Sequence, residues 1–224
     1  MAESASEQKY SWRDFIDGKL YLDTQVPWRD DPAYILLQQI PGLRESIGGR
    51  SAAALQQAIG LVRAVAGVDL GTEVHANQPA QGLCLGFGTN LMEPYDLLQA
   101  FGLTCVHAYE WIGEHVVEAA QAFQALRAAD PLLSDRLRLH HGTINDLSAL
   151  ADGSIQVVYT ANVFTSEIPM TAETFARAVQ EIVRVLEAGG ILLSRGSHGV
   201  LEAALTRHGR MLLQTPLVSV FEKA

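Results

Sequence analysis

The sequence predicts an α/β fold, with a doubly wound and mostly parallel sheet of seven strands and helices on both faces. From residue 81 onward, short apolar runs alternate with longer segments of helical periodicity. This alternation is typical of parallel sheets, because parallel strands are joined by crossover connections. Before residue 81 the pattern indicates only helices and loops. We therefore expect a helical cap over residues 1–80, part of the same domain, and a ligand-binding α/β unit over residues 81–224.

The predicted strands are short, apolar and separated by turn or helix signals. They cover residues 81–85, 103–109, 136–141, 155–162, 191–195, 211–215 and 217–222. Helices are predicted between them over residues 93–101, 113–129, 171–186 and 199–207. In the cap, one helix should begin at Asp30-Asp31-Pro32 and a second should cover residues 52–66. Gly189-Gly190 should end a helix and open the fifth strand.

The charge balance argues against a nucleic acid ligand. The chain carries 16 Lys and Arg against 25 Asp and Glu, a formal net charge of −9, and its basic residues are not clustered. Binding to a phosphate backbone needs concentrated positive charge. We therefore expect a small-molecule substrate and no nucleic acid partner.

The sequence also indicates neither a membrane segment nor an oxidising compartment. The N-terminus is polar, and no run approaches the about 18 apolar residues that cross a bilayer. A cytoplasmic location without a membrane partner is expected. Cys84 and Cys105 both lie in apolar strand segments, where we expect reduced core thiols rather than a disulfide or a metal site.

The sharpest local feature is a glycine turn between the first predicted strand and the helix after it. Gly86 and Gly88 are one residue apart, and glycine lets a ligand approach the backbone closely. About twenty residues later, Glu110 ends the second strand, where a carboxylate can accept hydrogen bonds from two ribose hydroxyls. A dinucleotide site would need a third glycine, and Leu91 stands there instead. The turn therefore favours a nucleoside ligand other than NAD.

Four segments in order resemble the class I S-adenosylmethionine (SAM) dependent methyltransferases. The segment from Leu83 to Asn90 is similar to their first motif, and Glu110 resembles their ribose-binding acid. The segments 152–162 and 181–193 resemble the family's fourth-strand and fifth-strand motifs. The similarity covers residues 81–197, and it implies a Rossmann-like fold and S-adenosyl-L-methionine as cofactor.

The resemblance also implies which residues contact the cofactor. The glycine turn, the end of the second strand, the loop after the third strand and the end of the fourth strand supply them in turn: Gly86, Phe87, Gly88, Asn90, Glu110, Trp111, Thr143, Ile144 and Asn162.

Two departures from the family pattern concern the amino acid end of SAM. Cys84 stands where the family usually has an acid, and Asn90 replaces the last glycine of the first motif. Because that acid helps to order the amino acid end, the sequence leaves open how this end is held. Thr143-Ile144 likewise replaces an acid near the adenine.

Three side chains are candidates for a catalytic role: Tyr10, Asn162 and His198. Six of the 16 aromatic residues lie in the first 34 positions, and Tyr10 among them could face a sulfonium; packing of the cap is the alternative. Asn162 ends the fourth strand, where it either contacts substrate or braces a loop. His198 follows the fifth strand as a base or as a solvated loop residue. His140 and His141 point to opposite faces of one strand, so no metal site is expected.

These observations favour a SAM-dependent methyltransferase that acts on a small molecule. A second hypothesis keeps SAM but breaks a different bond, with attack on the γ-carbon of the aminobutyrate arm and release of methylthioadenosine. The altered first motif and the aromatic cap are its motivation. A SAM-binding protein without chemistry and a dehydrogenase are the remaining alternatives.

Overall fold

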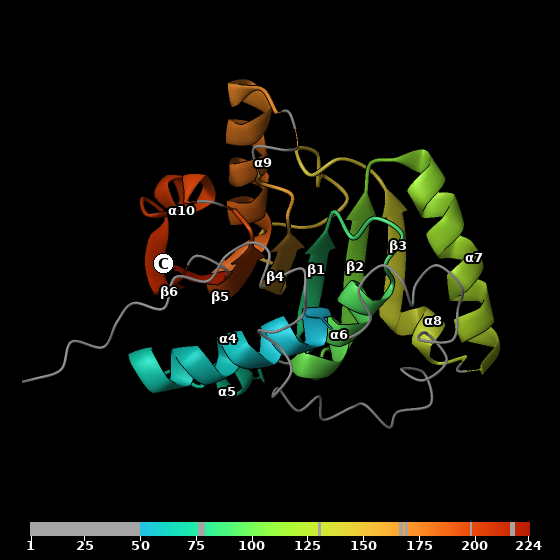
Figure 1. Cartoon of the computed structure of the whole chain (residues 1–224), viewed down its shortest axis with the longest axis horizontal. Helices are drawn as coiled ribbons and strands as arrows, with labels where there is room; N and C mark the ends of the chain where they lie inside the picture. Colours follow the sequence, from blue (N-terminus) through green and yellow to red (C-terminus); the bar gives the residue numbers. More distant parts are fainter. Residues whose placement is uncertain are drawn as a thin grey trace, which may run out of the picture.

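Seven strands form one sheet in the order β3-β2-β1-β4-β5-β7-β6 (Figure 1). The computed structural model describes residues 50–75, 79–129, 131–165, 168, 170–197, 199–215 and 218–224. The strands are β1 (Gln81–Leu85), β2 (Cys105–Glu110), β3 (Leu137–His141), β4 (Ile155–Ala161), β5 (Leu186–Arg195), β6 (Gly209–Gln214) and β7 (Val218–Lys223). Strands β1 to β5 pair in parallel, and β7 runs antiparallel to β5 and β6. The predicted seven-stranded, mostly parallel sheet is confirmed.

Helices cover both faces of this sheet, as a doubly wound fold requires. They are α4 (Arg50–Ala66), α5 (Leu70–His75), α6 (Met92–Ala100), α7 (Gly113–Ala129), α8 (Leu133–Arg136), α9 (Ala172–Val185) and α10 (Val200–Leu205). One apolar core includes side chains of α4, α6 and α7, and a second includes side chains of α9 and α10. Within the described residues, no helix is long and apolar enough to cross a membrane. The helix predicted from Asp30, Tyr10 and His198 lie outside these residues.

The inner strands β1 and β4 are mostly apolar because both of their faces are buried. In β1, Leu83 and Leu85 belong to the α9 core, whereas Cys84 between them belongs to the α6 core. In β4, Val158 and Tyr159 divide in the same way. Successive side chains of a strand point to opposite faces, so a strand buried on both sides has no polar alternation.

Strand β5 begins five residues earlier than the sequence predicted. Helix α9 ends at Val185, and Leu186 already pairs with Ile155 of β4. The register then shifts, so that Val157 pairs with Ile191. The prediction that Gly189-Gly190 opens the strand was therefore wrong. Gly189 has a φ of 76°, and glycine tolerates this left-handed conformation inside the irregular part of the strand.

The connection between β3 and β4 consists of turns rather than a helix. Arg184 of α9 holds it in place. Its guanidinium donates to the carbonyl oxygens of Leu147 and Leu150 at 2.9 and 3.0 Å, and it pairs with the carboxylates of Asp152 and Glu181. These hydrogen bonds raise the pKa of Arg184 further above its ordinary value. Arg184 thereby fixes residues 147–152 of the loop, whose first residues, 142–144, line the candidate site.

Candidate active site

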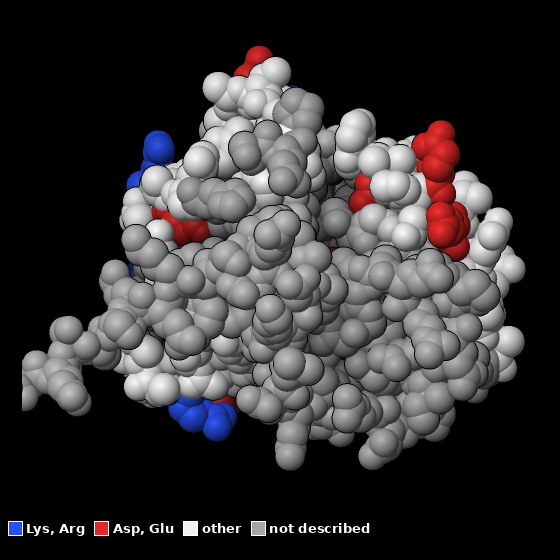
Figure 2. All heavy atoms as spheres, in the orientation of Figure 1, with Lys and Arg blue, Asp and Glu red and all other residues white. Residues whose placement is uncertain are grey.

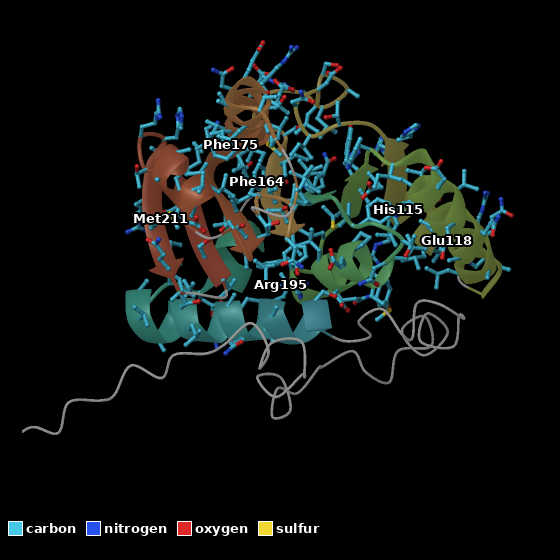
Figure 3. All side chains as sticks on the ribbon, turned by 45° about the horizontal axis from the view of Figure 1, so that its top comes forward. His115, Glu118, Phe164, Phe175, Arg195 and Met211 are labelled. Carbon is cyan, nitrogen blue, oxygen red and sulfur yellow. The ribbon has the colours of Figure 1, made fainter. Side chains whose placement is uncertain are left out.

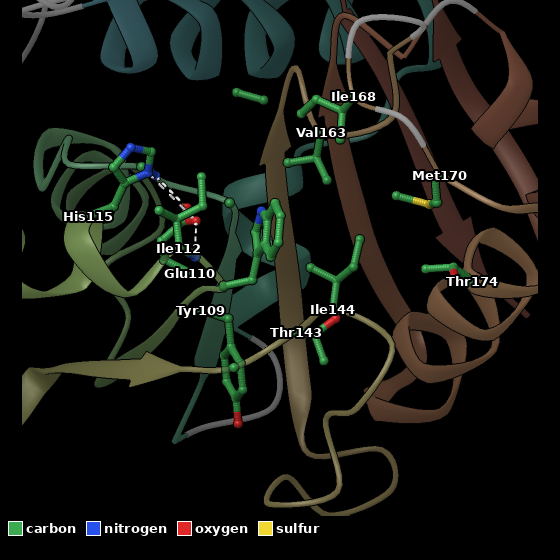
Figure 4. A pocket seen from close by; sticks show the side chains of 15 residues that line it. Tyr109, Glu110, Ile112, His115, Thr143, Ile144, Val163, Ile168, Met170 and Thr174 are labelled. Atoms are coloured by element: carbon green, nitrogen blue, oxygen red, sulfur yellow. Dashed lines mark hydrogen bonds and ion pairs between the residues drawn. The ribbon is translucent and has the colours of Figure 1, made fainter.

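A cavity of about 320 Å³ lies at the carboxyl ends of β1, β2, β3 and β4 (Figure 4). Ligands of open α/β sheets bind at this edge, where neighbouring crossovers separate. The residues around the cavity come from both halves of the sheet and from the first turns of α7 and α9. They are Gly86, Gly88, Tyr109, Glu110, Trp111, Ile112, His115, Gly142, Thr143, Ile144, Ala161, Val163, Ile168, Met170 and Thr174.

The glycine turn after β1 forms one wall of the cavity. Gly86 and Gly88 both have positive φ, at 68° and 61°. A Cβ on Gly86 would lie 2.4 Å from Cγ2 of Val163, and one on Gly88 would meet nothing within 4 Å. The N–H of Gly86 donates to the carbonyl oxygen of Tyr109 at 2.8 Å. Only glycine fits at position 86, because both its backbone conformation and its neighbour exclude a side chain.

Glu110 is buried at the end of β2, and its carboxylate is fixed by two backbone donors. One oxygen, Oε2, accepts from the N–H of Gly88 at 2.8 Å, and Oε1 accepts from the N–H of Ile112 at 2.9 Å. A carboxylate oxygen can accept more than one hydrogen bond. Glu110 therefore keeps acceptor capacity for a pair of hydroxyl groups inside the cavity.

His115 is a cavity residue that the sequence reasoning missed. Its Nδ1 lies 3.8 Å from Oε1 of Glu110 (Figure 4), and no hydrogen-bond partner of Nδ1 exists within the described part of the chain. A usable signal was present, because Ile112 and His115 are three residues apart at the start of a helix. Residues with this spacing share one side of a helix, so both follow Glu110 into the cavity.

The far part of the cavity is mainly apolar. Figure 4 shows Ile144, Val163 and Met170 on the side away from His115. Trp111 lies at the rim with 66% of its surface exposed. Phe164 and Phe175 pack edge to face behind this part, with ring centroids 5.9 Å apart (Figure 3). These surfaces suit a flat heterocycle with few polar groups.

Six of the nine predicted cofactor residues line the cavity: Gly86, Gly88, Glu110, Trp111, Thr143 and Ile144. Phe87 and Asn90 are not among the residues that line the cavity. Phe87 is buried in the core beneath α6. Asn90 is also buried, and its Oδ1 accepts from the N–H of Met92 at 3.1 Å. Its side chain thus supports the start of α6, while its Nδ2 has no partner in the described chain.

Asn162 follows β4 in a strained conformation beside the cavity residues Ala161 and Val163. Its φ is 57°, which is uncommon for a residue other than glycine. Its N–H donates to the carbonyl oxygen of Arg195 at 2.8 Å, and its Oδ1 lies against Gly196. That oxygen is buried and lacks a hydrogen-bond partner within the described residues. The catalytic roles suggested for Asn162, Tyr10 and His198 stay predictions.

The described chain contains no group of three or more His, Cys, Asp or Glu side chains that could hold a metal ion. Cys84 and Cys105 are both buried free thiols.

Comparison with known families decides the class of this site. A family model described as a methyltransferase domain matches residues 83–194, which is half of the chain. The chain belongs to the SAM-dependent methyltransferases. Its cofactor is accordingly SAM, and the matched region runs from the glycine turn to the end of β5. None of the curated proteins matches this methyltransferase at a significant level.

Solved structures show the same fold at low sequence identity. TrmN from Thermus thermophilus is 17% identical, with a TM-score of 0.53 over 84% of this chain and 53% of that chain. The N-methyltransferase NodS from Bradyrhizobium japonicum WM9 is 10% identical, with a TM-score of 0.52 over 76% and 96% of the two chains. A putative methyltransferase from Streptococcus mutans in complex with S-adenosylhomocysteine (SAH) is 12% identical, with a TM-score of 0.50 over 69% and 95%.

These likenesses establish the methyltransferase fold and leave the acceptor open. The chain spans between 46% and 58% of the length of four of the matched structures, TrmN among them. What those longer proteins act on therefore has to be argued separately from the residues of this one.

Proposed function

We propose that this protein transfers the methyl group of SAM to a small-molecule acceptor. The observation that carries the proposal is the charge around the cavity. Among the described residues that line it, none is Lys or Arg. Figure 2 shows acidic side chains gathered over α7, where Glu114 and Glu118 are exposed. A nucleic acid acceptor would bring phosphate charge to this edge, where the described lining residues offer no cation to receive it.

The residues of the cavity fit the nucleoside part of SAM. In this proposal the ribose hydroxyls donate to Glu110, whose two oxygens are already oriented by the N–H groups of Gly88 and Ile112. The adenine lies against the apolar surfaces of Trp111, Ile144 and Val163. Thr143 at the same edge offers a hydroxyl to the ring nitrogens.

SAM supplies an electrophilic methyl group, and the acceptor's lone pair forms the new bond to carbon as the bond to sulfur breaks. The sulfur leaves as an uncharged thioether, so the positive charge passes to the acceptor and is lost with a proton where the attacking atom carries one. The chain's part is to hold the ligands in line and to exclude water. A base is needed only for an acceptor that is protonated at neutral pH.

Product analysis by mass spectrometry tests the proposal. The purified protein is incubated with SAM, first alone and then with metabolite fractions or with RNA and DNA. We expect SAM to stay intact alone and SAH to form with a metabolite fraction. Glu110→Gln should lose this turnover, while the exposed neighbour variant Glu118→Gln should keep it. Methylthioadenosine from SAM alone, or SAH only in the presence of nucleic acid, would contradict the proposal.

A further inference from the structure

Helix α6 and strand β5 bring two buried, oppositely charged side chains together. Glu93 lies in the first turn of α6 with 5% of its surface exposed, and Arg195 is the last residue of β5 with 2% exposed. Nη2 of Arg195 lies 3.8 Å from Oε1 of Glu93. Figure 3 places Arg195 in the middle of the molecule, between β5 and α6. The distance indicates an ion pair that is too long for a direct hydrogen bond.

Glu93 faces the position at which the family's acid is missing. Burial raises the pKa of the Cys84 thiol well above its usual value, and the nearby carboxylates of Glu93, Asp96 and Glu110 raise it further. Cys84 also belongs to the apolar core that contains side chains of α6, the helix that carries Glu93. Helix α6 thus carries a carboxylate on the side of β1 where the family's acid is missing.

The strand register places Arg195 next to a residue of the cavity wall. Arg195 pairs with Ala161 of β4, and Ala161 lines the cavity. Tyr159 and Leu193 lie two residues earlier on the same two strands. Both belong to the core that contains α6 side chains. Because side chains alternate along a strand, Arg195 lies on that same side.

We propose that Glu93 and Arg195 bind the amino acid end of SAM, with Glu93 accepting from its ammonium group and Arg195 donating to its carboxylate. This inference rests on the proposed use of SAM and extends it to the end of the cofactor for which the first motif lacks its acid. The nucleoside lies between Glu110 and Trp111, and the methionine part runs past Gly86 toward Ala161.

The electrostatics of Glu93 agree with the binding of a further cation, the ammonium group of SAM. Burial raises the pKa of Glu93 to about 7, although Arg195 lowers it, and the carboxylates of Asp96 and Glu110 raise it. A buried carboxylate in this situation is only partly ionised near neutral pH, and an ammonium group beside it favours the ionised form. A zwitterion adds one charge of each sign and leaves the net charge of the buried region unchanged.

Two ligands that differ only at the amino acid end test the assignment by calorimetry. SAH carries the ammonium and carboxylate groups, and 5′-methylthioadenosine lacks both. Glu93→Gln, which preserves side-chain shape, should weaken SAH binding about 10- to 100-fold. It should leave methylthioadenosine binding within about twofold of wild type, which also shows that the variant is folded. Arg195→Met should behave in the same way, and Arg195→Lys should recover part of the SAH affinity.

Glu118→Gln and Arg127→Met are the matched controls, because both side chains are exposed on α7. Neither control should change the affinity for either ligand. A second measurement needs no variant: the wild-type protein should bind SAH at least about 100-fold more tightly than methylthioadenosine. Equal affinities of the wild type for both ligands, or equal losses of affinity for both ligands in Glu93→Gln, would overturn the assignment of Glu93 and Arg195 to the amino acid end. The proposed function would still stand. Failure of the wild type to bind either ligand would overturn the proposed function with it.

Discussion

Replacing Glu110 by Gln is the most direct perturbation of the ribose site. The side chain keeps its size, but one carboxylate oxygen becomes an NH2 group that faces the N–H of Gly88 or of Ile112. One of these two charge-assisted hydrogen bonds is lost, and each is worth about 1.5 to 3 kcal/mol. Since Glu110 is buried, we expect the free energy of unfolding to fall by about 2 kcal/mol and Tm to fall by about 4 to 8 °C.

The same substitution should weaken binding of the nucleoside through its ribose. A hydroxyl that donated to a carboxylate loses about 1.5 to 3 kcal/mol, which corresponds to about 10- to 150-fold in Kd. Calorimetry with adenosine and with 2′,3′-dideoxyadenosine isolates this contribution, because only adenosine carries the two hydroxyls. Wild type should prefer adenosine, and Glu110→Gln should bind the two ligands nearly equally. Glu114→Gln, an exposed acid of α7, is the control. If Glu110→Gln retained the preference for adenosine, the assignment of Glu110 to the ribose would be wrong.

Three further predictions concern the structure around the site. Gly86→Ala forces a side chain into a positive φ and against Val163, so urea unfolding should show a loss of about 2 to 4 kcal/mol, partly restored by adding Val163→Ala. Burial, followed by His140 and Arg138, lowers the pKa of His107 from 6.5 to about 4, so its neutral form stabilises the folded protein above pH 6.5. This contribution, about 1 to 2 kcal/mol after screening by solvent, is lost as the pH falls through 4. The urea midpoints measured at pH 7 and at pH 4 should therefore lie closer together in His107→Gln than in the wild type. If the two midpoints differ as much in His107→Gln as in the wild type, burial of His107 is unimportant. Arg184→Met removes the donors to the loop after β3 and should lower Tm by about 4 to 8 °C, with faster hydrogen exchange over residues 142–154 than in α7.

The fold could be predicted because burial of the strands leaves a strong local record. A strand covered on both faces is mostly apolar, as in β4, and its length is then visible in the sequence. The glycine turn and Glu110 were predictable for a related reason: a required positive φ and a polar residue at a strand end are both local features. The start of β5 was not, because it depends on pairing with Ile155, about thirty residues away.

The remaining part of the site depends on which elements become neighbours. Met170 precedes α9 and Thr174 lies in its first turn, and only the pairing of β1 with β4 brings that segment beside the glycine turn. The cofactor contact of Asn90 stays a prediction, and in the structure its side chain oxygen accepts a hydrogen bond from the backbone at the start of α6. Local capping and ligand contact use the same amide atoms, so sequence position alone does not separate them. Glu93 and Arg195 carry no joint signal in the sequence, since a helix and a strand a hundred residues apart supply them.

Because β1 lies between β2 and β4 in the sheet, we expect the cavity to form late in folding. Gly82 of β1 pairs with Val106 of β2 and with Val157 of β4, so one of its two neighbours arrives only after a long intervening stretch has been ordered. Such distant pairings carry a high loop-closure cost and form slowly. A nascent chain that ends before β4 can display Gly86 and Glu110 but lacks the opposite wall formed by Val163 and Met170. We therefore expect the nucleoside to bind only the completed sheet and, by mass action, to favour the last step of assembly.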